Sequence, residues 1–400
     1  MVLVMLKKYQ ISPYFFLPSV ENNTNTNQWR VIHKNTKEIY TINEAIYTFL
    51  TIFTLPTTFT DGLQQFAVLC GATEEEIAKI VDEFFGEMYE QEILIREEVY
   101  LHLQKSMQED SSKQVSFFKK FEILKTLSED NYSNIYLVEN KVKKNKSIVK
   151  VLYLNRIFSE EQKKEQKKAF LQEIKIHQEI NGHPAITGFE AFKVYKNSIF
   201  LQTTYSSGIG LYKFLSNNTL LSLQDKIQIY LNIVSAYSHL HQKDVLHGDI
   251  HANNILVDTD FSVKIIDFDM SYHHTSHENE IIVRGGIREY VAPEKLSYDA
   301  FEIVTTHSDF QSEVYQLGVI GYYIFFNKYP FIADTWKELA RKIEKETPFF
   351  DNSFAKIPEM LVCFLQVALA KKPINRFISA KEMEKALSMI KKEFCVTAVY

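Results

Sequence analysis

Two short apolar segments in the middle of the chain constrain its fold more than any other feature. Residues 254–257 and 263–266 are rich in β-branched side chains and close enough in sequence to pair as a hairpin. Such a hairpin would hold Asn254 and Asp267, at its open end, near one point. Asp and Asn are also common turn residues, so an ordinary hairpin is the competing interpretation. The spacing His-x-Asp-x-x-x-x-Asn over residues 247–254 argues for a functional site instead.

The side chains gathered at this point suit phosphoryl transfer from ATP. That reaction needs a base near the acceptor hydroxyl and oxygen ligands for magnesium, and little covalent help from the protein. Asp249 is the candidate base. Asn254 and Asp267 are candidate metal ligands, because Mg²⁺ prefers hard oxygen donors together with the phosphates of the nucleotide. We therefore expect ATP and Mg²⁺ as cofactors.

Length and composition indicate a globular protein with more than one domain. The 400 residues exceed one typical core, so we expect two or three domains. The apolar share of 46% and the charged share of 24% are typical of globular rather than disordered chains. A net charge of −5 gives no general argument for binding nucleic acid, and we expect no such partner.

Cysteine usage and hydropathy predict a cytoplasmic protein. The three cysteines, Cys70, Cys363 and Cys395, are far apart, which suits a reducing compartment and gives no zinc-site spacing. The N-terminus lacks the basic stretch that precedes the apolar core of a signal peptide. The chain contains no stretch of about 18 apolar residues, so we expect no membrane partner.

Residues 1–106 are predicted to form a separate winged-helix-like domain. Strands are expected at residues 29–32 and 38–42, where β-branched and aromatic side chains flank turn residues. A helix over residues 43–53 and a Thr-rich connector over residues 56–61 are expected to follow. Strands and helices within such a short stretch are typical of small winged-helix domains.

A further helix of this domain has a clear start and an apolar face. Thr73 and Glu76 form a capping-box pattern, in which the side chains bind free backbone N–H groups of the first turn. Apolar side chains then recur at helical spacing, which predicts an amphipathic helix. They are Ile77, Ile80, Val81, Phe84, Phe85 and Met88. A strand at residues 92–95 is expected to close the domain.

A polar segment separates this domain from the rest of the chain. Residues 107–118 are predicted to be a linker, because their first part is polar and lacks an apolar period. A strand-rich domain is expected over residues 119–208 and a helix-rich domain over residues 209–400. The whole is therefore predicted to have an α+β fold.

From about residue 120 to residue 390 the chain resembles protein kinases. Short segments similar to the family's motifs occur in the family's order. They are residues 147–152, 170–174, 200–205, 247–254, 265–269, 290–294, 313–318 and 373–376. The resemblance implies a bilobal kinase-like fold, with the two lobes at residues 119–208 and 209–400.

The resemblance also implies roles for individual residues. Lys150 would bind the α- and β-phosphates, and Glu173 on the next helix would pair with Lys150. Thr204 and Tyr205 fall in the segment similar to the hinge, whose backbone meets adenine. Further along, Arg376 is expected to pair with Glu294 of the Ala-Pro-Glu segment, and Glu313 stands where the family usually has Asp.

The phosphate-binding loop departs from the kinase pattern. Glycine lets backbone N–H groups approach phosphate closely, but Ser128, Asp130 and Ser133 stand at the glycine positions of this loop. By position, Ser128 and Ser133 are the candidate nucleotide contacts, whereas Asp130 would bring negative charge near the phosphates. Three interpretations remain open: the loop stands off from the nucleotide, it moves when peptide binds, or ATP binds weakly. A plain polar hairpin turn is the structural alternative.

The catalytic loop departs from the pattern as well. Gly248 stands where many kinases carry Arg, and Asp269 replaces the last Gly of Asp-Phe-Gly. His251 stands where protein kinases often carry a Lys that binds the γ-phosphate, so it is expected either to donate to that phosphate or to orient Asp249. A structural core histidine is the alternative. The His-Gly-Asp-x-His form is similar to aminoglycoside phosphotransferases and to kinase-like domains of lanthipeptide synthetases.

The first domain resembles, in its layout, PqqD-like winged helices that recognise leader peptides. The resemblance implies that an extended leader peptide adds a strand at the sheet edge near residues 38–42. Phe84, Phe85 and Met88 would line the adjoining groove. A domain that only packs on the kinase lobe is the alternative.

These inferences combine into one functional hypothesis. The chain is expected to be an ATP- and Mg²⁺-dependent kinase that phosphorylates Ser or Thr of a ribosomally made precursor peptide, captured through its leader by the first domain. A separate lyase or cyclase is the expected partner for later steps, because no such domain is evident in this sequence. A small-molecule phosphotransferase and a catalytically silent kinase-like scaffold are the alternatives.

Overall fold

The chain forms two compact units in a computed structural model. One unit comprises Met1–Lys168 and Ala191–Gln202, and the other comprises Ala169–Glu190 and Thr203–Tyr400. The structure describes residues 8–13, 15–17, 29–33, 39–42, 44–90, 93–112, 116–275, 282–283, 287–296, 304–305, 309–350 and 357–397.

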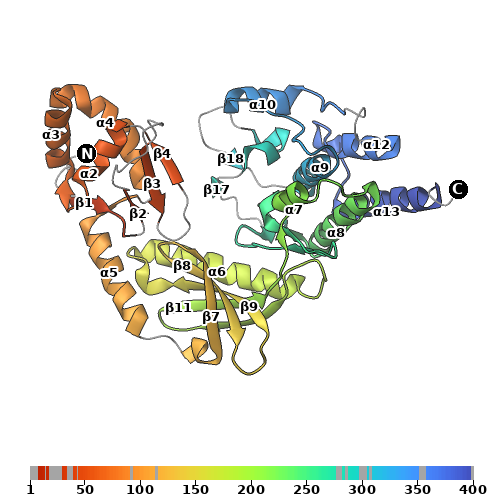
Figure 1. Cartoon of the computed structure of the whole chain (residues 1–400), viewed down its shortest axis with the longest axis horizontal. Coiled ribbons are helices and arrows are strands. Elements are labelled where there is room, and N and C mark those ends of the chain that lie inside the picture. The colour runs from red at the N-terminus through yellow and green to blue at the C-terminus, as the bar shows by residue number, and fades with distance from the viewer. Residues whose placement is uncertain are drawn as a thin grey trace. The chain divides into compact units, whose positions relative to one another are not determined.

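In the described residues, two small sheets and helices α2, α3 and α4 make up the start of the first unit (Figure 1). One sheet has the order β5-β1-β6, from Thr57–Thr58, Lys8–Ile11 and Leu94–Arg96. The other has the order β2-β3-β4, from Phe15–Phe16, Trp29–His33 and Ile39–Ile42. The antiparallel pair β3–β4 confirms the two strands predicted there. The helices are α2 (Glu44–Ile52), α3 (Phe59–Cys70) and α4 (Glu74–Glu90).

The predicted Thr-rich connector over residues 56–61 is wrong. Thr57 and Thr58 form strand β5, and α3 begins directly after them. The Thr58 side chain accepts a hydrogen bond from the Asp61 N–H at 3.0 Å. The threonines were read as loop residues, but Thr is also a good N-cap, since its hydroxyl satisfies a free N–H of the first turn.

The start of α4 confirms the predicted capping box. The Thr73 N–H donates to the Glu76 carboxylate at 2.9 Å, and the Glu76 N–H donates to the Thr73 hydroxyl at 3.4 Å. The same helix corrects the predicted groove, because Met88 is buried and Phe85 packs edge-on against Tyr9 in the domain core. The side chains of Ile80 and Phe84 lie outside the described residues.

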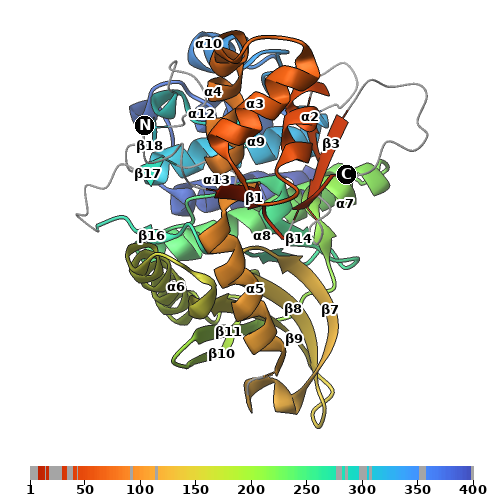
Figure 2. The ribbon, with the colours of Figure 1, turned by 90° about the vertical axis from the view of Figure 1, so that its left-hand side faces the viewer.

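The predicted linker over residues 107–118 is largely helical. Helix α5 (Glu97–Ser112) runs into it, and the 3₁₀ helix η1 (Ser116–Lys120) ends it, while residues 113–115 lie outside the described part. The helical part of the segment includes Met107, Gln108 and Glu109, which are good helix formers, so polarity alone does not make it a loop. Figure 2 shows α5 running from the first domain toward the next sheet.

That sheet is built from five strands in the order β10-β11-β9-β8-β7. Strand β8 pairs antiparallel with both β7 and β9. Phe117, Phe121 and Phe200 pack on it with Val138 and Val149 as a small core. The strands are β7 (Phe121–Glu129), β8 (Ser133–Asn140), β9 (Lys146–Tyr153), β10 (Phe189–Val194) and β11 (Ser198–Thr204). Helix α6 (Glu160–Ile180) continues from this part into the second unit.

Helices dominate the second unit, and α8 and α9 lie at its centre. A Cβ on Gly321 of α9 would lie 2.5 Å from the Tyr230 ring of α8, so only glycine allows this approach. The Tyr230 hydroxyl donates to the Leu317 carbonyl of α9 at 3.0 Å. The helices are α7 (Leu211–Asn217), α8 (Leu223–Gln242), α9 (Phe310–Phe326), α10 (Trp336–Lys345), α12 (Glu359–Ala368) and α13 (Ala380–Thr397).

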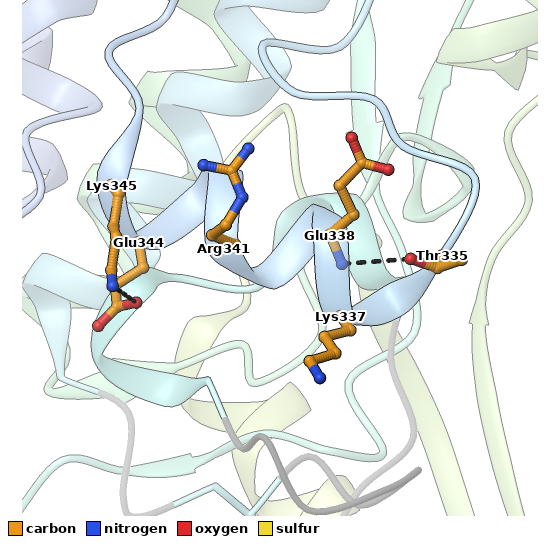
Figure 3. Close-up of a pocket in the computed structure, with 6 residues that line it drawn as sticks. All are labelled: Thr335, Lys337, Glu338, Arg341, Glu344 and Lys345. Atoms are coloured by element: carbon orange, nitrogen blue, oxygen red, sulfur yellow. Dashed lines mark hydrogen bonds and ion pairs between the residues drawn. The ribbon is translucent and has the colours of Figure 1, made fainter.

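A surface depression of about 500 Å³ lies over α10 and is lined by its charged side chains (Figure 3). Two of its three cations already have partners, since Lys345 pairs with Glu344 and Arg341 pairs with Glu346. We therefore do not assign it a ligand. Among the described helices, none combines the length and apolar character that crossing a membrane requires.

Candidate active site

The hairpin predicted from the two apolar segments is confirmed in the second unit. Strands β14 (Ile255–Val257) and β15 (Val263–Ile265) pair antiparallel, with Ile255 opposite Ile265. At the open end, the Ile266 N–H donates to the Asn254 carbonyl at 3.0 Å. This bond brings the backbone of Asn254 beside the residue that precedes Asp267. The strand pairing therefore does what the sequence pattern predicted, and places the two candidate ligands at one edge.

Three of the predicted site residues form a hydrogen-bonded cluster. The Asn254 amide donates to the Asp249 carbonyl at 3.0 Å and to its Oδ2 at 3.1 Å. His251 Nε2 lies 3.2 Å from the same Oδ2. Since both amide hydrogens of Asn254 turn toward Asp249, its side-chain oxygen remains for another partner. These bonds fix the base and a candidate ligand relative to each other.

The hydrogen bonds of His251 define its tautomer. The Asn253 N–H donates to Nδ1 at 3.2 Å, so Nδ1 is an acceptor and Nε2 carries the hydrogen that points to Asp249. The 3.1 Å contact between Nε2 and the Asn254 amide nitrogen then joins two donors and is no hydrogen bond. Of the two roles predicted for His251, this geometry favours the orientation of Asp249.

Asp249 is partly buried and remains a carboxylate. Burial works against its ionised form, but the hydrogen bonds from His251 and from the Asn254 amide lower its pKa below the ordinary value. An ionised Asp249 accepts a hydrogen bond from an incoming hydroxyl, and its depressed pKa makes it a weak proton acceptor. Positioning is thus the larger part of what Asp249 can contribute.

His247, which the residue-by-residue predictions left out, ties the catalytic loop to Asp267. The Asp249 N–H donates to its Nδ1 at 3.3 Å, and its Nε2 donates to the Ile266 carbonyl at 3.2 Å. The ring is fully buried beside Phe268, with centroids 5.0 Å apart. One side chain therefore positions the backbone at both acidic residues. Its place at the head of the His-x-Asp pattern was the only signal for this role.

Gly248 and Asp267 adopt left-handed backbone conformations, with φ of 80° and 67°. Glycine adopts this region freely, which explains a glycine at 248, and Asp tolerates it better than most side chains. The Gly248 N–H donates to the buried Glu313 carboxylate at 2.9 Å, and His241 bonds its other oxygen at 3.0 Å. Glu313 of α9 therefore holds the backbone of the catalytic loop at Gly248. Asp267 lies exposed at the surface.

The pairing predicted between Arg376 and Glu294 is confirmed. Two parallel hydrogen bonds of 2.7 Å join the guanidinium to the carboxylate, and the Arg376 side chain is fully buried. Ser312 of α9 also donates to Glu294 at 2.7 Å. Burial opposes ionisation of Glu294, but these partners outweigh it and lower its pKa. The Ala-Pro-Glu segment is thus anchored to the helical core.

Lys150 and Glu173 lie where the sequence predicted them, on a strand and on the following helix. Lys150 is a half-buried residue of β9 and stands opposite Ile135 in the sheet. Glu173 is a buried residue of α6. They belong to different units, so their pairing stays a prediction.

The remaining candidate nucleotide contacts divide between the two units. Thr204, at the end of β11, exchanges two 2.9 Å hydrogen bonds with the backbone of Gly188, and Tyr205 follows it as an exposed residue. Ser128 lies on β7 and Ser133 begins β8. The Ser133 N–H and hydroxyl both donate to Asp130, at 2.6 and 2.8 Å. The hydrogens of Ser133 are therefore directed to a carboxylate of its own loop.

The donor set suits a hard cation such as magnesium. Asn254 and Asp267 supply an amide oxygen and a carboxylate, the hard ligands that Mg²⁺ takes alongside phosphate oxygens. Within the described residues, no three His, Cys, Asp or Glu side chains gather to hold a metal by themselves. A nucleotide would therefore have to supply part of the coordination.

Comparison with known proteins agrees with this geometry. The protein kinase domain matches residues 121–388. The serine/threonine-protein kinase PrkC of Bacillus subtilis (strain 168) is 25% identical over 270 residues, which cover 66% of this chain and 39% of PrkC. The probable serine/threonine-protein kinase PknB of Lactococcus lactis subsp. lactis (strain IL1403) is 24% identical over 204 residues, covering 50% of this chain and 31% of PknB.

The chain thus spans less than half the length of these curated relatives. The residues matched by the protein kinase domain include the catalytic loop, the hairpin and the Glu294–Arg376 pair described above. Since the kinase domain match covers more than half of the sequence, the chain belongs to the protein kinase family.

Proposed function

We propose that this chain is an ATP- and Mg²⁺-dependent protein kinase that phosphorylates Ser or Thr in a ribosomally made precursor peptide. The observation that carries the proposal is the cluster of Asp249, His251 and Asn254, held beside Asp267 by His247. It combines an oriented carboxylate with two hard oxygen donors, and phosphoryl transfer needs both.

In this proposal each side chain has a defined task. Asp249 receives the hydrogen of the acceptor hydroxyl, and His251 keeps its Oδ2 in place. Asn254 and Asp267 hold Mg²⁺, which neutralises developing charge on the phosphates when it is bound. Lys150 binds the α- and β-phosphates and Glu173 steadies it, by position in the family pattern.

The first domain supplies the proposed peptide-recognition step. Strand β4 lies at the edge of its three-stranded sheet, and an edge strand offers free backbone groups for pairing with an extended peptide. Met88 is buried and is therefore not available to flank a bound leader. The leader peptide and a later-acting lyase or cyclase are the proposed partners.

A transfer assay tests the proposal. The full chain is incubated with labelled ATP, Mg²⁺ and the product of a small peptide gene beside its own gene, with and without the leader part of that peptide. We expect label on Ser or Thr of the full peptide and much less on the leaderless form. Equal labelling of both forms would exclude leader capture, and absence of transfer from a folded protein would exclude the kinase.

One observation favours a second candidate, a catalytically silent scaffold. Asp130 accepts hydrogen bonds from N–H groups of the phosphate loop. A kinase-like domain that transfers no phosphate does not need these groups for a nucleotide. A ligand that binds the native state raises its unfolding temperature by mass action. Thermal unfolding with and without millimolar ATP and Mg²⁺ separates the two candidates, because a scaffold without a nucleotide site shows no shift.

A further inference from the structure

The loop between β7 and β8, which stands where kinases bind phosphate, is closed by its own acidic residue. Asp130 Oδ1 accepts the N–H of Tyr132 at 2.9 Å and the N–H of Ser133 at 2.6 Å. Its Oδ2 accepts the Ser133 hydroxyl at 2.8 Å. The Asp130 N–H donates to the Ser133 carbonyl at 2.9 Å and completes the turn. All of these bonds lie within the loop.

Neighbouring residues hold the loop in this form. The Tyr132 carbonyl accepts the N–H of Tyr153, at the end of β9, at 2.8 Å. At the base of the hairpin, the buried Asn134 donates to Glu129 at 3.3 Å and accepts from Arg156 at 3.2 Å. The tip and the base are both tied to the rest of the sheet, so the closed turn belongs to the folded hairpin.

A carboxylate in this position competes with a phosphate in two ways. Successive backbone N–H groups in a turn form an anion-binding concavity, and each N–H has one hydrogen to donate. Carboxylate and phosphate oxygens are acceptors for the same hydrogens, so Asp130 satisfies donors that a nucleotide would otherwise use. The negative charge of Asp130 also repels a phosphate that comes near.

We infer that Asp130 is an internal substitute for a nucleotide phosphate and determines the nucleotide specificity of this kinase. The inference rests on the proposed function. Because Asp130 holds the N–H groups of Tyr132 and Ser133, these two groups are not available to a bound triphosphate. Each further phosphate then gains little affinity through the loop, and the preference for ATP over adenosine rests on Lys150 and the magnesium ligands.

Calorimetric binding of Mg²⁺-ATP, ADP and adenosine to the full chain tests this inference with three variants. Asp130→Asn keeps an acceptor oxygen and removes the charge, whereas Asp130→Gly removes both and frees the N–H groups. Glu122→Gln is the matched control, since it removes a negative charge from an exposed position of β7, in the same hairpin. Circular dichroism verifies that each variant is folded.

We expect ATP affinity, relative to adenosine, to rise about fivefold in Asp130→Asn from lost repulsion. It should rise roughly tenfold or more in Asp130→Gly, where phosphate regains charge-assisted bonds, and stay unchanged in Glu122→Gln. An ATP-to-adenosine ratio that is the same in the wild type and Asp130→Gly overturns the inference while the kinase function stands. No nucleotide binding by any folded variant overturns the proposed function and the inference with it.

Discussion

The catalytic loop and the phosphate loop use the same residue type in opposite ways. In the catalytic loop, Asp249 is partly buried, and His251 and Asn254 orient its carboxylate toward a reacting group. In the phosphate loop, Asp130 is exposed and turns back onto its own backbone N–H groups. The Asp249 carboxylate is held in position for the proposed substrate. The Asp130 carboxylate binds N–H groups that a nucleotide phosphate would otherwise bind.

The difference shows where this chain departs from its family. The catalytic loop has Gly248 where many kinases carry Arg, and Glu313 and His247 support its backbone on either side. The phosphate loop replaces its glycines and changes which groups are available to a ligand. Both loops depart from the family's sequence pattern, but only in the phosphate loop does this change which backbone groups can bind a ligand. The following predictions test that difference.

Replacement of Asp249 by Asn has the largest expected effect. The rate of phosphoryl transfer should fall roughly 10²- to 10⁴-fold, the usual range for a positioned acid–base group. Asn254 and His251 would lose a charged acceptor, but the variant should remain folded. Single-turnover transfer from labelled ATP measures the change. Full transfer by Asp249→Asn would show that Asp249 is not the base, and the contrast drawn between Asp249 and Asp130 would no longer hold.

Replacement of Glu294 by Gln tests the stability of the frame that holds the catalytic loop. It leaves the Arg376 charge buried without its counter-ion, which costs roughly 3 kcal/mol. Urea unfolding of the full chain measures the loss. Glu338→Gln is the matched control, because Glu338 pairs with Lys342 at an exposed site and its loss should cost less than about 1 kcal/mol.

The same pair gives a pH dependence with a defined sign. Glu294 has a lower pKa in the folded chain than in the unfolded chain, so its contribution is complete above the unfolded-state value. The contribution disappears as pH falls through the depressed pKa. Wild-type protein should therefore lose stability in acid more steeply than Glu294→Gln. Parallel curves for the two proteins would contradict this linkage.

Replacement of Gly248 by Ala has a smaller expected effect, on stability. A side chain at φ of 80° costs about 1 kcal/mol, and the Glu313 bond gives the backbone no freedom to relax. Gly86→Ala is the control with the opposite sign. Gly86 lies in α4 with nothing within 4 Å of an added Cβ, so alanine should stabilise that helix by about 0.5–1 kcal/mol. Destabilisation by both variants would argue against the backbone explanation.

Contacts between residues close together in the chain were easier to predict from the sequence than contacts between residues far apart in it. The hairpin of residues 254–257 and 263–266 was predictable, because β-branched segments and their short connection are local signals. The Glu294–Arg376 pair required the family order of motifs, since the two residues are far apart in the chain. The link from His247 to the Ile266 carbonyl has no local signal beyond the His-x-Asp pattern.

The errors have the same cause. Composition predicts Thr58 as a loop residue. In the structure its side chain accepts a backbone N–H of its own segment and starts a helix. Met88 was assigned to a groove from its place on an apolar face, but which face of a helix meets the core is a tertiary property.

Replacement of His102 by Ala has the smallest expected effect and tests whether the first domain reaches the phosphate loop. His102 of α5 bonds the Asn155 carbonyl of η2 (Leu154–Arg156) at 2.6 Å, and the next residue, Arg156, bonds Asn134 of the loop hairpin. Loss of one such bond costs about 1 kcal/mol. If it loosens the hairpin, His102→Ala should change ATP affinity a few-fold, while Lys105→Ala, at an exposed position of α5, should not. Equal ATP affinity in both variants would show that contacts within the sheet of β7, β8 and β9 fix the phosphate loop, independently of the first domain.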